Sequence, residues 1–247
     1  MDKRQKEDVR GPERPLGRRE VLKAGAAGAH GALAGYAGTA TALASGGHGG
    51  SAIGHAKRYA MVIDLRRCVG CQACSVACKS ENNVPLGVWR SWVKQVERGT
   101  YPNTQRNFLP RLCNHCDSPA CVEACPTKAS YQRDDGVVLI HQERCVGCKL
   151  CMAACPYDAR YLHPVKKITD KCTFCVHRVD EGVVPSCVNT CQGRARIFGD
   201  LNDPTSEVAK LVAREPVQTL KIELGTEPRV FYIGADVGAM GHVRKEV

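Results

Sequence analysis

The sequence contains few aromatic residues and no long, strongly apolar segment. Phe, Trp and Tyr make up only 5% of its 247 residues, which is little for a core built from packed side chains alone. Hydrophobic residues still reach 43%, so the composition excludes a chain that is disordered throughout. Because no segment is apolar enough over a sufficient length, we expect that this chain does not span a membrane by itself.

The sequence also lacks the patterns that accompany substrate chemistry. It contains neither the Ser, His and Asp order of hydrolases nor a glycine-rich loop that would cradle phosphates. No basic stripe interleaved with aromatic residues is present, so we expect no nucleic-acid binding in spite of a formal net charge of +10. These absences favour a protein without catalytic residues of its own.

Cysteine, by contrast, is abundant. The 16 cysteines form four groups of four with none left over. Two of the groups share the spacing C-x2-C-x2-C-x3-C, in RCVGCQACSVAC at residues 67–78 and in RCVGCKLCMAAC at residues 144–155. The four groups are Cys68, Cys71, Cys74 and Cys78; Cys113, Cys116, Cys121 and Cys125; Cys145, Cys148, Cys151 and Cys155; and Cys172, Cys175, Cys187 and Cys191.

Three kinds of site use cysteines at such density. Disulfides need Cα atoms about 5.5 Å apart, which crowded runs of this kind accommodate poorly. Zinc prefers two separate C-x2-C pairs, and a third cysteine only three residues further on departs from that spacing. The run is instead that of bacterial ferredoxins, in which three thiolates bind one [4Fe–4S] cluster and the fourth binds another. We therefore expect four [4Fe–4S] clusters, with zinc and disulfides as alternatives.

The first residues of the chain have the features of an export signal. Arg18 and Arg19 precede a weakly apolar stretch of Ala and Gly, and an A-x-A pattern typical of signal cleavage follows at residues 42–44. We expect a twin-arginine signal peptide over residues 1–44 and a linker over residues 45–57. Such a signal implies export of the folded protein to the periplasmic or extracytoplasmic face of the cytoplasmic membrane.

The cysteine groups predict two ferredoxin-like modules. Residues 67–78 and 144–155 share eight identities in twelve at an offset of 77, which indicates an internal repeat. The second and third groups are joined by a short segment in which Asp135-Gly136 lies between alternating apolar residues, a pattern typical of a hairpin. These two groups would form one module, so the first and fourth groups would pair around it. We therefore expect an α+β fold of two nested ferredoxin-like modules, a double dicluster domain with loop insertions.

The segments around the groups complete this expected organisation. A strand leads into the first group, and a long excursion follows it, in which the spacing of Trp89 and Trp92 indicates one face of a helix. A helix near residues 201–217 would be capped by Asp203 or Thr205. The expected boundaries are 58–200 for the four-cluster domain, with 58–110 and 165–200 as one module and 111–164 as the module inserted in it, and 201–247 as a C-terminal extension.

The motifs resemble those of the four-cluster electron-transfer subunits of the molybdopterin (dimethyl sulfoxide reductase) oxidoreductase family. The resemblance rests on RYAMVIDLRRCVGCQAC, RLCNHCDSPACVEACP, RCVGCKLCMAACPYDARYLHP and DKCTFCVHRVDEGVVPSCVNTC, which look most like the tetrathionate and polysulfide reductase branch. It implies a relay of single electrons between a molybdopterin-containing catalytic subunit and a polytopic, quinone-reacting membrane subunit. The chain would then associate with the membrane peripherally, through this partner.

The resemblance also implies the ligands of each cluster. Cluster 1 would be bound by Cys68, Cys71, Cys74 and Cys191, cluster 2 by Cys78, Cys172, Cys175 and Cys187, cluster 3 by Cys113, Cys116, Cys121 and Cys155, and cluster 4 by Cys125, Cys145, Cys148 and Cys151. We expect the relay to serve a tetrathionate, polysulfide or thiosulfate reductase. The same role in a respiratory arsenate, sulfite or formate oxidoreductase stays open, as does a freestanding exported ferredoxin-like carrier.

Four further residues lie beside the ligands. His115 and His177 could donate a ring N–H to cluster sulfur, although exposed or otherwise satisfied histidines are more common. Gly70 and Gly147 lie between ligands, where we expect backbone dihedrals that glycine permits most easily.

Overall fold

The structure, a computed structural model, describes residues 56–235. The expected signal peptide, most of the linker and the last residues of the C-terminal extension lie outside the described residues. Within residues 56–235, no helix combines the length and the apolar character needed to cross a membrane. Helices and strands alternate along this part of the chain, which confirms the mixed content of the expected α+β fold.

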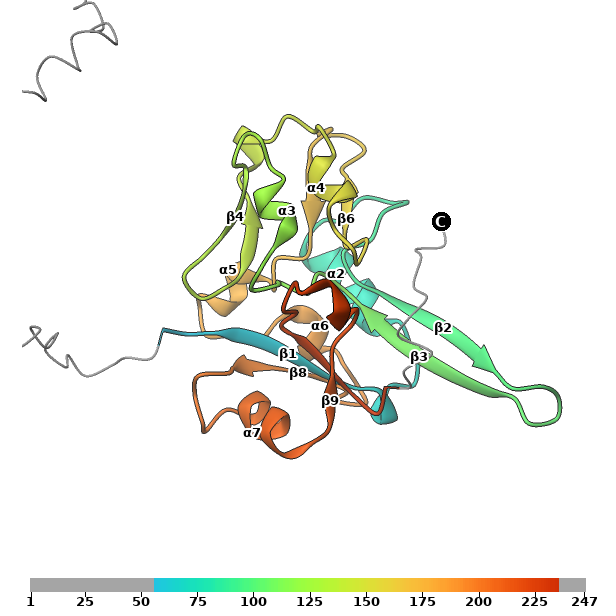
Figure 1. Cartoon of the computed structure of the whole chain (residues 1–247). Helices are drawn as coiled ribbons and strands as arrows, with labels where there is room; N and C mark the ends of the chain where they lie inside the picture. Colours follow the sequence, from blue (N-terminus) through green and yellow to red (C-terminus); the bar gives the residue numbers. More distant parts are fainter. Residues whose placement is uncertain (1–55, 236–247) are drawn as a thin grey trace, which may run out of the picture. The chain divides into compact units, whose positions relative to one another are not determined.

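A four-stranded sheet of order β8-β1-β10-β9 contains the first strand of the described chain (Figure 1). The inner strand β1 (Tyr59–Asp64) pairs antiparallel with β8 (Arg196–Asp200) and parallel with β10 (Val230–Ile233). At the edge, β9 (Val217–Gln218) pairs antiparallel with β10. The strand predicted to lead into the first cysteine group is therefore confirmed, as an inner strand of this sheet.

Both faces of β1 are buried, and the alternation of its side chains separates two parts of the core. Ala60 and Val62 pack on one face with Val208 of α7 (Glu207–Arg214). Met61 and Ile63 point to the opposite face, where they pack in a cluster that contains several of the cysteines. The sheet thus carries the cysteine-bearing segments on the face away from α7.

Short helices hold the cysteine groups. The first group begins after the 3-10 turn η1 (Leu65–Arg67), and the third begins after the similar turn η2 (Gln142–Arg144). The helix of the first group contacts that of the fourth, α2 with α6, and the helix of the second contacts that of the third, α3 with α4. The five helices are α2 (Ala73–Glu81), α3 (Ala120–Glu123), α4 (Leu150–Ala153), α5 (Val176–Val179) and α6 (Ser186–Asn189).

Three antiparallel hairpins connect these groups. The hairpin expected around Asp135-Gly136 is confirmed, because Gly136 has a positive φ of +80° and its N–H donates to the Arg133 carbonyl at 2.8 Å. Figure 1 shows the longest hairpin, β2–β3, extending away from the sheet. The strands are β2 (Trp92–Arg98) with β3 (Gln105–Arg111), β4 (Ser130–Gln132) with β5 (Val138–Ile140), and β6 (Arg160–Leu162) with β7 (Thr169–Lys171). A last 3-10 turn, η3 (Ile222–Leu224), precedes β10.

Two local predictions were wrong. Trp89 and Trp92 do not share a helical face, because α2 ends at Glu81 and Trp92 is the first residue of β2. Pro85 follows α2 closely, and proline is incompatible with a continuing helix.

The helix expected after residue 201 is confirmed as α7, but its N-terminal cap position is Ser206 and not Asp203 or Thr205. The Asp203 carboxylate instead accepts hydrogen bonds from the Thr205 N–H at 2.8 Å and hydroxyl at 2.7 Å. Asp203 therefore closes a turn that precedes the helix.

Candidate metal centres

Two cavities are each lined by four cysteines that come from two different groups. Cys68, Cys71 and Cys74 of the first group line one cavity together with Cys191 of the fourth. In the second cavity, three thiols of the second group meet one thiol of the third, namely Cys113, Cys116, Cys121 and Cys155. The structure thus brings together the thiols expected around cluster 1 and around cluster 3.

The thiols expected around cluster 2 are all buried. Asn82 lies beside two of them, since its Nδ2 is 3.8 Å from Cys78 Sγ and 3.7 Å from Cys175 Sγ. Burial, and then the proximity of Cys187 and Cys175, raises the pKa of the Cys78 thiol to about 12. Burial and the neighbouring Cys78 and Cys187 likewise raise the pKa of Cys172 well above its ordinary value. Cys78 and Cys172, whose pKa values are raised in this way, need bound metal to become thiolates.

The thiols expected around cluster 4 lie in α4 or close to the ends of α3, η2 and α4. Cys125 follows α3, Cys145 follows η2, Cys148 is exposed in the loop, and Cys151 is buried in α4, which contacts α3. Burial acts to raise the pKa of Cys125, but hydrogen bonds from the Ser130 N–H and from Thr127 outweigh it and lower this pKa. Cys125 is therefore already surrounded by donors that favour its thiolate.

Each expected set contains four thiols, the number that a zinc site with four cysteine ligands and a [4Fe–4S] cluster both require. Four thiolates bound to one zinc at about 2.3 Å have sulfur atoms about 3.8 Å apart. Among residues 56–235, no three His, Cys, Asp or Glu side chains lie close enough together to hold one metal ion. All 16 cysteines are also free of disulfide bonds. A [4Fe–4S] cubane, which contains several metal atoms, is the group that the cysteine spacing predicts for these sets.

Two buried arginines lie beside the thiols and provide a further test of whether the cavities fit a [4Fe–4S] cluster. Arg196 is 2% exposed, lines the first cavity and donates to Cys187 Sγ at 3.7 Å. Arg160 is 1% exposed, lines the second cavity and donates to Cys121 Sγ at 2.9 Å. Arg196 also donates to Ser91 Oγ at 2.9 Å and to Met61 Sδ at 4.0 Å, and Arg160 also donates to Ser130 Oγ at 2.7 Å.

Neither guanidinium is fully satisfied by the protein. The Nε of both arginines and the Nη1 of Arg160 are buried without a hydrogen-bond partner among the described residues. A buried cation whose partners are hydroxyls and sulfur atoms is costly unless negative charge lies nearby. A [4Fe–4S] cluster with four thiolates carries that negative charge, so the residues around both cavities fit the group that the cysteine spacing predicts.

These arginines were not predicted from the sequence, although a signal for them exists. Each follows the fourth cysteine of its group by five residues, Cys155 for Arg160 and Cys191 for Arg196, and each is preceded by alanine. A single arginine near a ligand is usually interpreted as a charged surface residue. The same position in two groups, at the start of β6 and of β8, indicates a shared buried role.

The two glycines between ligands have the expected backbone conformation. Gly70 has φ +69° and Gly147 has φ +68°. A side chain would also force a neighbour to shift, since a Cβ on Gly70 would lie 2.2 Å from the Phe108 ring and one on Gly147 would lie 2.2 Å from the Lys167 carbonyl oxygen. Glycine is therefore favoured here by space as well as by φ.

The two histidines beside ligands differ. His177 is about half exposed, and its Nε2 is 2.8 Å from Glu81 Oε1, so it is an ordinary satisfied histidine. His115 is fully buried, accepts the Val138 N–H on its Nδ1 at 3.1 Å, and stacks on Phe174 with ring centroids 3.8 Å apart. Its Nε2 has no hydrogen-bond partner among the described residues. Of the two histidines, therefore, only His115 fits the expected role of a hydrogen-bond donor to cluster sulfur.

Known proteins with similar sequences have the same cofactor signature. The family described as "4Fe-4S dicluster domain" matches residues 60–126 in one form and residues 104–201 in another. One subunit of the tetrathionate reductase of Salmonella typhimurium is 51% identical over 183 residues, which cover 72% of this chain and 73% of that protein. One polypeptide of the polysulfide reductase of Wolinella succinogenes is 44% identical over 181 residues, covering 72% and 95%.

A third relative belongs to a different reductase. The arsenate respiratory reductase iron-sulfur subunit of a Shewanella species is 38% identical over 225 residues, covering 71% of this chain and 96% of that protein. Two dicluster domains that bind two clusters each account for all 16 cysteines. The chain therefore carries four [4Fe–4S] clusters.

Proposed function

This chain belongs to the family of four-cluster electron-transfer subunits of the molybdopterin oxidoreductases, and from that membership we propose that it relays single electrons within a tetrathionate, polysulfide or thiosulfate reductase. The observation that carries the proposal is the pair of cavities, each lined by three thiols of one cysteine group and one thiol of another. Ferredoxin-type modules share their cysteines between clusters in this way.

We infer that the two modules are nested. Residues 58–110 and 165–200 form one module, and residues 111–164 form the module inserted in it. The contacts of α2 with α6 and of α3 with α4 support this division, because they join the first group to the fourth and the second to the third. Residues 201–247 then form a C-terminal extension, of which β9 and β10 complete the sheet around β1 and α7 packs against that sheet.

We further propose the four ligand sets that the motifs imply. The two cavities support those of clusters 1 and 3, and the position of Asn82 between Cys78 and Cys175 supports that of cluster 2. The sets are Cys68, Cys71, Cys74 and Cys191 for cluster 1; Cys78, Cys172, Cys175 and Cys187 for cluster 2; Cys113, Cys116, Cys121 and Cys155 for cluster 3; and Cys125, Cys145, Cys148 and Cys151 for cluster 4.

Each cluster, when bound, supplies a site that accepts and releases one electron. The chain's own part is to hold these sites rigidly, to exclude water and to set their electrostatic surroundings. Cys172 and Cys187 are 7% and 6% exposed, so the protein excludes water from the proposed cluster 2. Arg160 and Arg196 provide fixed positive charge beside the thiols, which favours the more negative, reduced state of a cluster.

The relay needs places where electrons enter and leave. Cys71 and Cys148, the second cysteines of the two near-identical runs, are the exposed members of the sixteen. Val69 and Val146 beside them are 66% and 71% exposed, so apolar surface surrounds both thiols. We infer that electrons are exchanged with partners near clusters 1 and 4.

The proposed partners are a molybdopterin-containing catalytic subunit and a quinone-reacting membrane subunit. The relatives are named as components of reductases with more than one kind of subunit, which supports a catalytic partner. The membrane subunit is proposed from the family resemblance, with this chain attached to the membrane peripherally through it. We propose no nucleic acid as a binding partner.

Purification of the complex from its native membranes under anaerobic conditions tests this function. We expect about 16 iron and 16 sulfide per chain, together with a larger chain that contains molybdenum or tungsten. The complex should reduce tetrathionate, polysulfide or thiosulfate with a reduced quinone analogue as donor. Turnover of arsenate, sulfite or formate alone would move the chain to another branch of the family, and elution as an isolated monomer would favour a freestanding carrier.

We also propose that residues 1–44 direct export by the twin-arginine route to the extracytoplasmic side of the membrane. These residues lie outside the described part of the chain, and the support is the Arg18-Arg19 pair with the segment that follows it. Replacing both arginines by lysine should leave a cluster-loaded chain in the cytoplasmic fraction. Unchanged export of the variant would reject this route.

A further inference from the structure

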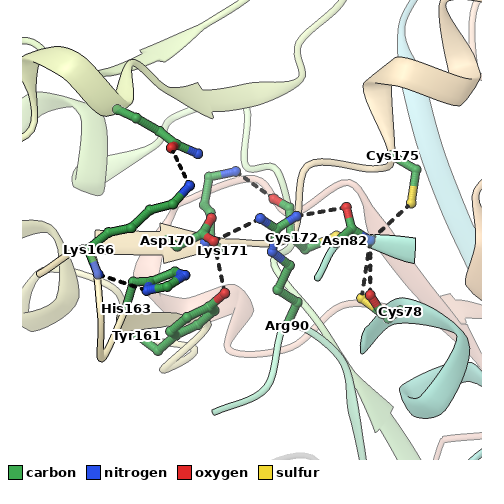
Figure 2. A network of polar contacts seen from close by, with 11 residues as sticks. Cys78, Asn82, Arg90, Tyr161, His163, Lys166, Asp170, Lys171, Cys172 and Cys175 are labelled. Carbon is green, nitrogen blue, oxygen red and sulfur yellow. Dashed lines mark hydrogen bonds and ion pairs between the residues drawn. The ribbon is translucent and has the colours of Figure 1, made fainter. Parts of the chain in front are cut away.

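The amide of Asn82 lies between two thiols that come from different cysteine groups (Figure 2). Asn82 is the residue that follows α2, and its Nδ2 donates to the Cys78 carbonyl at 3.1 Å. The same Nδ2 is 3.8 Å from Cys78 Sγ and 3.7 Å from Cys175 Sγ. Both thiols belong to the ligand set proposed for cluster 2.

Arg90 determines which end of this amide faces the sulfur atoms. Its Nη1 donates to Asn82 Oδ1 at 2.8 Å. A guanidinium has only donors, so the amide oxygen must face Arg90 and the amide NH₂ must face the thiols. The orientation of the Asn82 side chain is thus defined by chemistry.

Arg90 is in turn held by the β6–β7 hairpin, as Figure 2 shows. Its Nη2 donates to Asp170 Oδ2 at 2.8 Å, in an ion pair whose side chains are 10% and 13% exposed. The Tyr161 hydroxyl donates to the same carboxylate oxygen at 2.8 Å, and the Lys171 N–H donates to Asp170 Oδ1 at 2.7 Å. Because the guanidinium and the carboxylate neutralise each other, the network adds donors beside the thiols with little net charge.

The other cysteine groups use the backbone where the first group uses this side chain. The residue four positions after the fourth cysteine is alanine in the second, third and fourth groups and Asn82 in the first. In the fourth group the Ala195 N–H donates to Cys191 Sγ at 3.3 Å, and the Ala159 N–H bonds the Cys155 thiol in the same way.

In the first group the backbone donor is already engaged. Since α2 runs for nine residues, the Asn82 N–H closes the helix by donating to the Cys78 carbonyl at 3.2 Å. The side-chain Nδ2 takes over the contact with sulfur.

We propose that Asn82 donates to the sulfur atoms of cluster 2 and raises its reduction potential, with Arg90 and Asp170 as positioning residues that act through Asn82. The inference rests on the proposed function, because it requires Cys78 and Cys175 to bind one cluster. A hydrogen bond to ligand sulfur stabilises the reduced, more negative cluster, so its loss lowers the potential.

The test is an EPR-monitored redox titration of the purified complex that carries Asn82→Ala. One cluster should become harder to reduce by about three- to tenfold in its equilibrium constant, where tenfold is about 59 mV for a one-electron couple. The affected signal should be the one that Cys78→Ser abolishes. The matched control is Asn189→Ala, which removes an exposed asparagine at the end of α6 and should leave all four potentials unchanged.

A second variant covers the case in which Asn82→Ala loses the cluster. Arg90→Met combined with Asp170→Asn keeps Asn82 and leaves no unpaired buried carboxylate, but it removes the donor that orients the amide, so it should lower the potential of the same cluster by a smaller factor. Unmoved potentials in both variants, or an equal shift of all four clusters, would overturn the inference. Failure of the proposed ligand set would differ, because Cys78→Ser and Cys175→Ser would then affect different clusters.

Discussion

The two near-identical cysteine runs, residues 67–78 and 144–155, form the same loop in different surroundings. Each begins after a 3-10 turn, η1 or η2. Gly70 and Gly147 have φ values of +69° and +68°, and Gln72 and Lys149, the cap residues of the following helices, have φ values of +60° and +65°. Equal local sequence therefore produces equal local backbone.

The runs differ in the elements that come after them and in the groups that pack on them. The first continues into α2, with nine residues, whereas α4 has four and is followed by β6. A ring from β3, Phe108, packs over Gly70, whereas a backbone carbonyl, that of Lys167, packs over Gly147. Thus spacing between cysteines defines each loop, while distant segments define which thiols and donors meet.

The largest expected effect comes from breaking the exchange of cysteines between groups. Cys155→Ser should remove the cluster that we propose is bound by Cys113, Cys116 and Cys121, because Cys155 lines their cavity. The cluster beside its own run should stay, with a loss of about four irons per chain. Iron analysis and EPR of the complex measure both.

Cys151→Ser is the comparison for this variant, because Cys151 lies on the same short helix and belongs to the other proposed set. It should remove the signal that Cys155→Ser leaves in place. Loss of the same signal in both variants would show that each run binds one cluster with its own four thiols.

A smaller effect is expected from the buried arginines. Arg196→Met and Arg160→Met keep most of the side-chain volume but remove the positive charge beside Cys187 and Cys121. The reduction potentials of the adjoining clusters should fall, since the reduced state loses a stabilising charge. Stability should fall by about 1–3 kcal/mol through the lost hydrogen bonds. Redox titration and chemical denaturation of the complex check the two effects separately.

Arg194→Met is the control for the arginine pair. Arg194 is exposed and only two residues from Arg196, so this variant removes the same formal charge in water. The reduction potentials of the clusters in Arg194→Met should remain close to those of the unchanged protein because solvent screens the charge of Arg194. Equal shifts for Arg194→Met and Arg196→Met would mean that burial of the guanidinium does not matter.

The cysteine spacing predicted much of the site because it is a local signal. The loops around Gly70 and Gly147, the strand β1 and the hairpin at Asp135-Gly136 all follow from a few adjacent residues, and the structure confirms each of them. The sequence also predicted that Cys191 lies near Cys68, because the nested order that we infer leaves the first and fourth groups as partners.

The rest depends on contacts between residues distant in sequence, for which one sequence holds no local pattern. Asn82 meets Cys175, and Arg90 meets Asp170, only because the β6–β7 hairpin packs against the segment after α2. The wrong prediction for Trp89 and Trp92 has the same origin, since a three-residue spacing is compatible with a helix and with a loop that enters a strand. Packing decides between them.

The smallest expected effect comes from adding one methyl group to each copy of the run. Alanine at a positive φ costs about 1–2 kcal/mol wherever it is placed. Gly182→Ala measures this cost alone, because Gly182 has φ +78° and a Cβ there would meet nothing within 4 Å. Gly70→Ala should cost more, since its Cβ meets the Phe108 ring, which can shift.

Gly147→Ala should cost most of the three, because its Cβ would lie 2.2 Å from the Lys167 carbonyl oxygen, and backbone yields less than a ring. Rates of thermal unfolding of the loaded complex should therefore rise in the order Gly182→Ala, Gly70→Ala, Gly147→Ala. If Gly70→Ala and Gly147→Ala unfolded at equal rates, the two runs would share their surroundings as well as their sequence. The conclusion that distant segments give the two loops different neighbours would then be wrong at these two glycines.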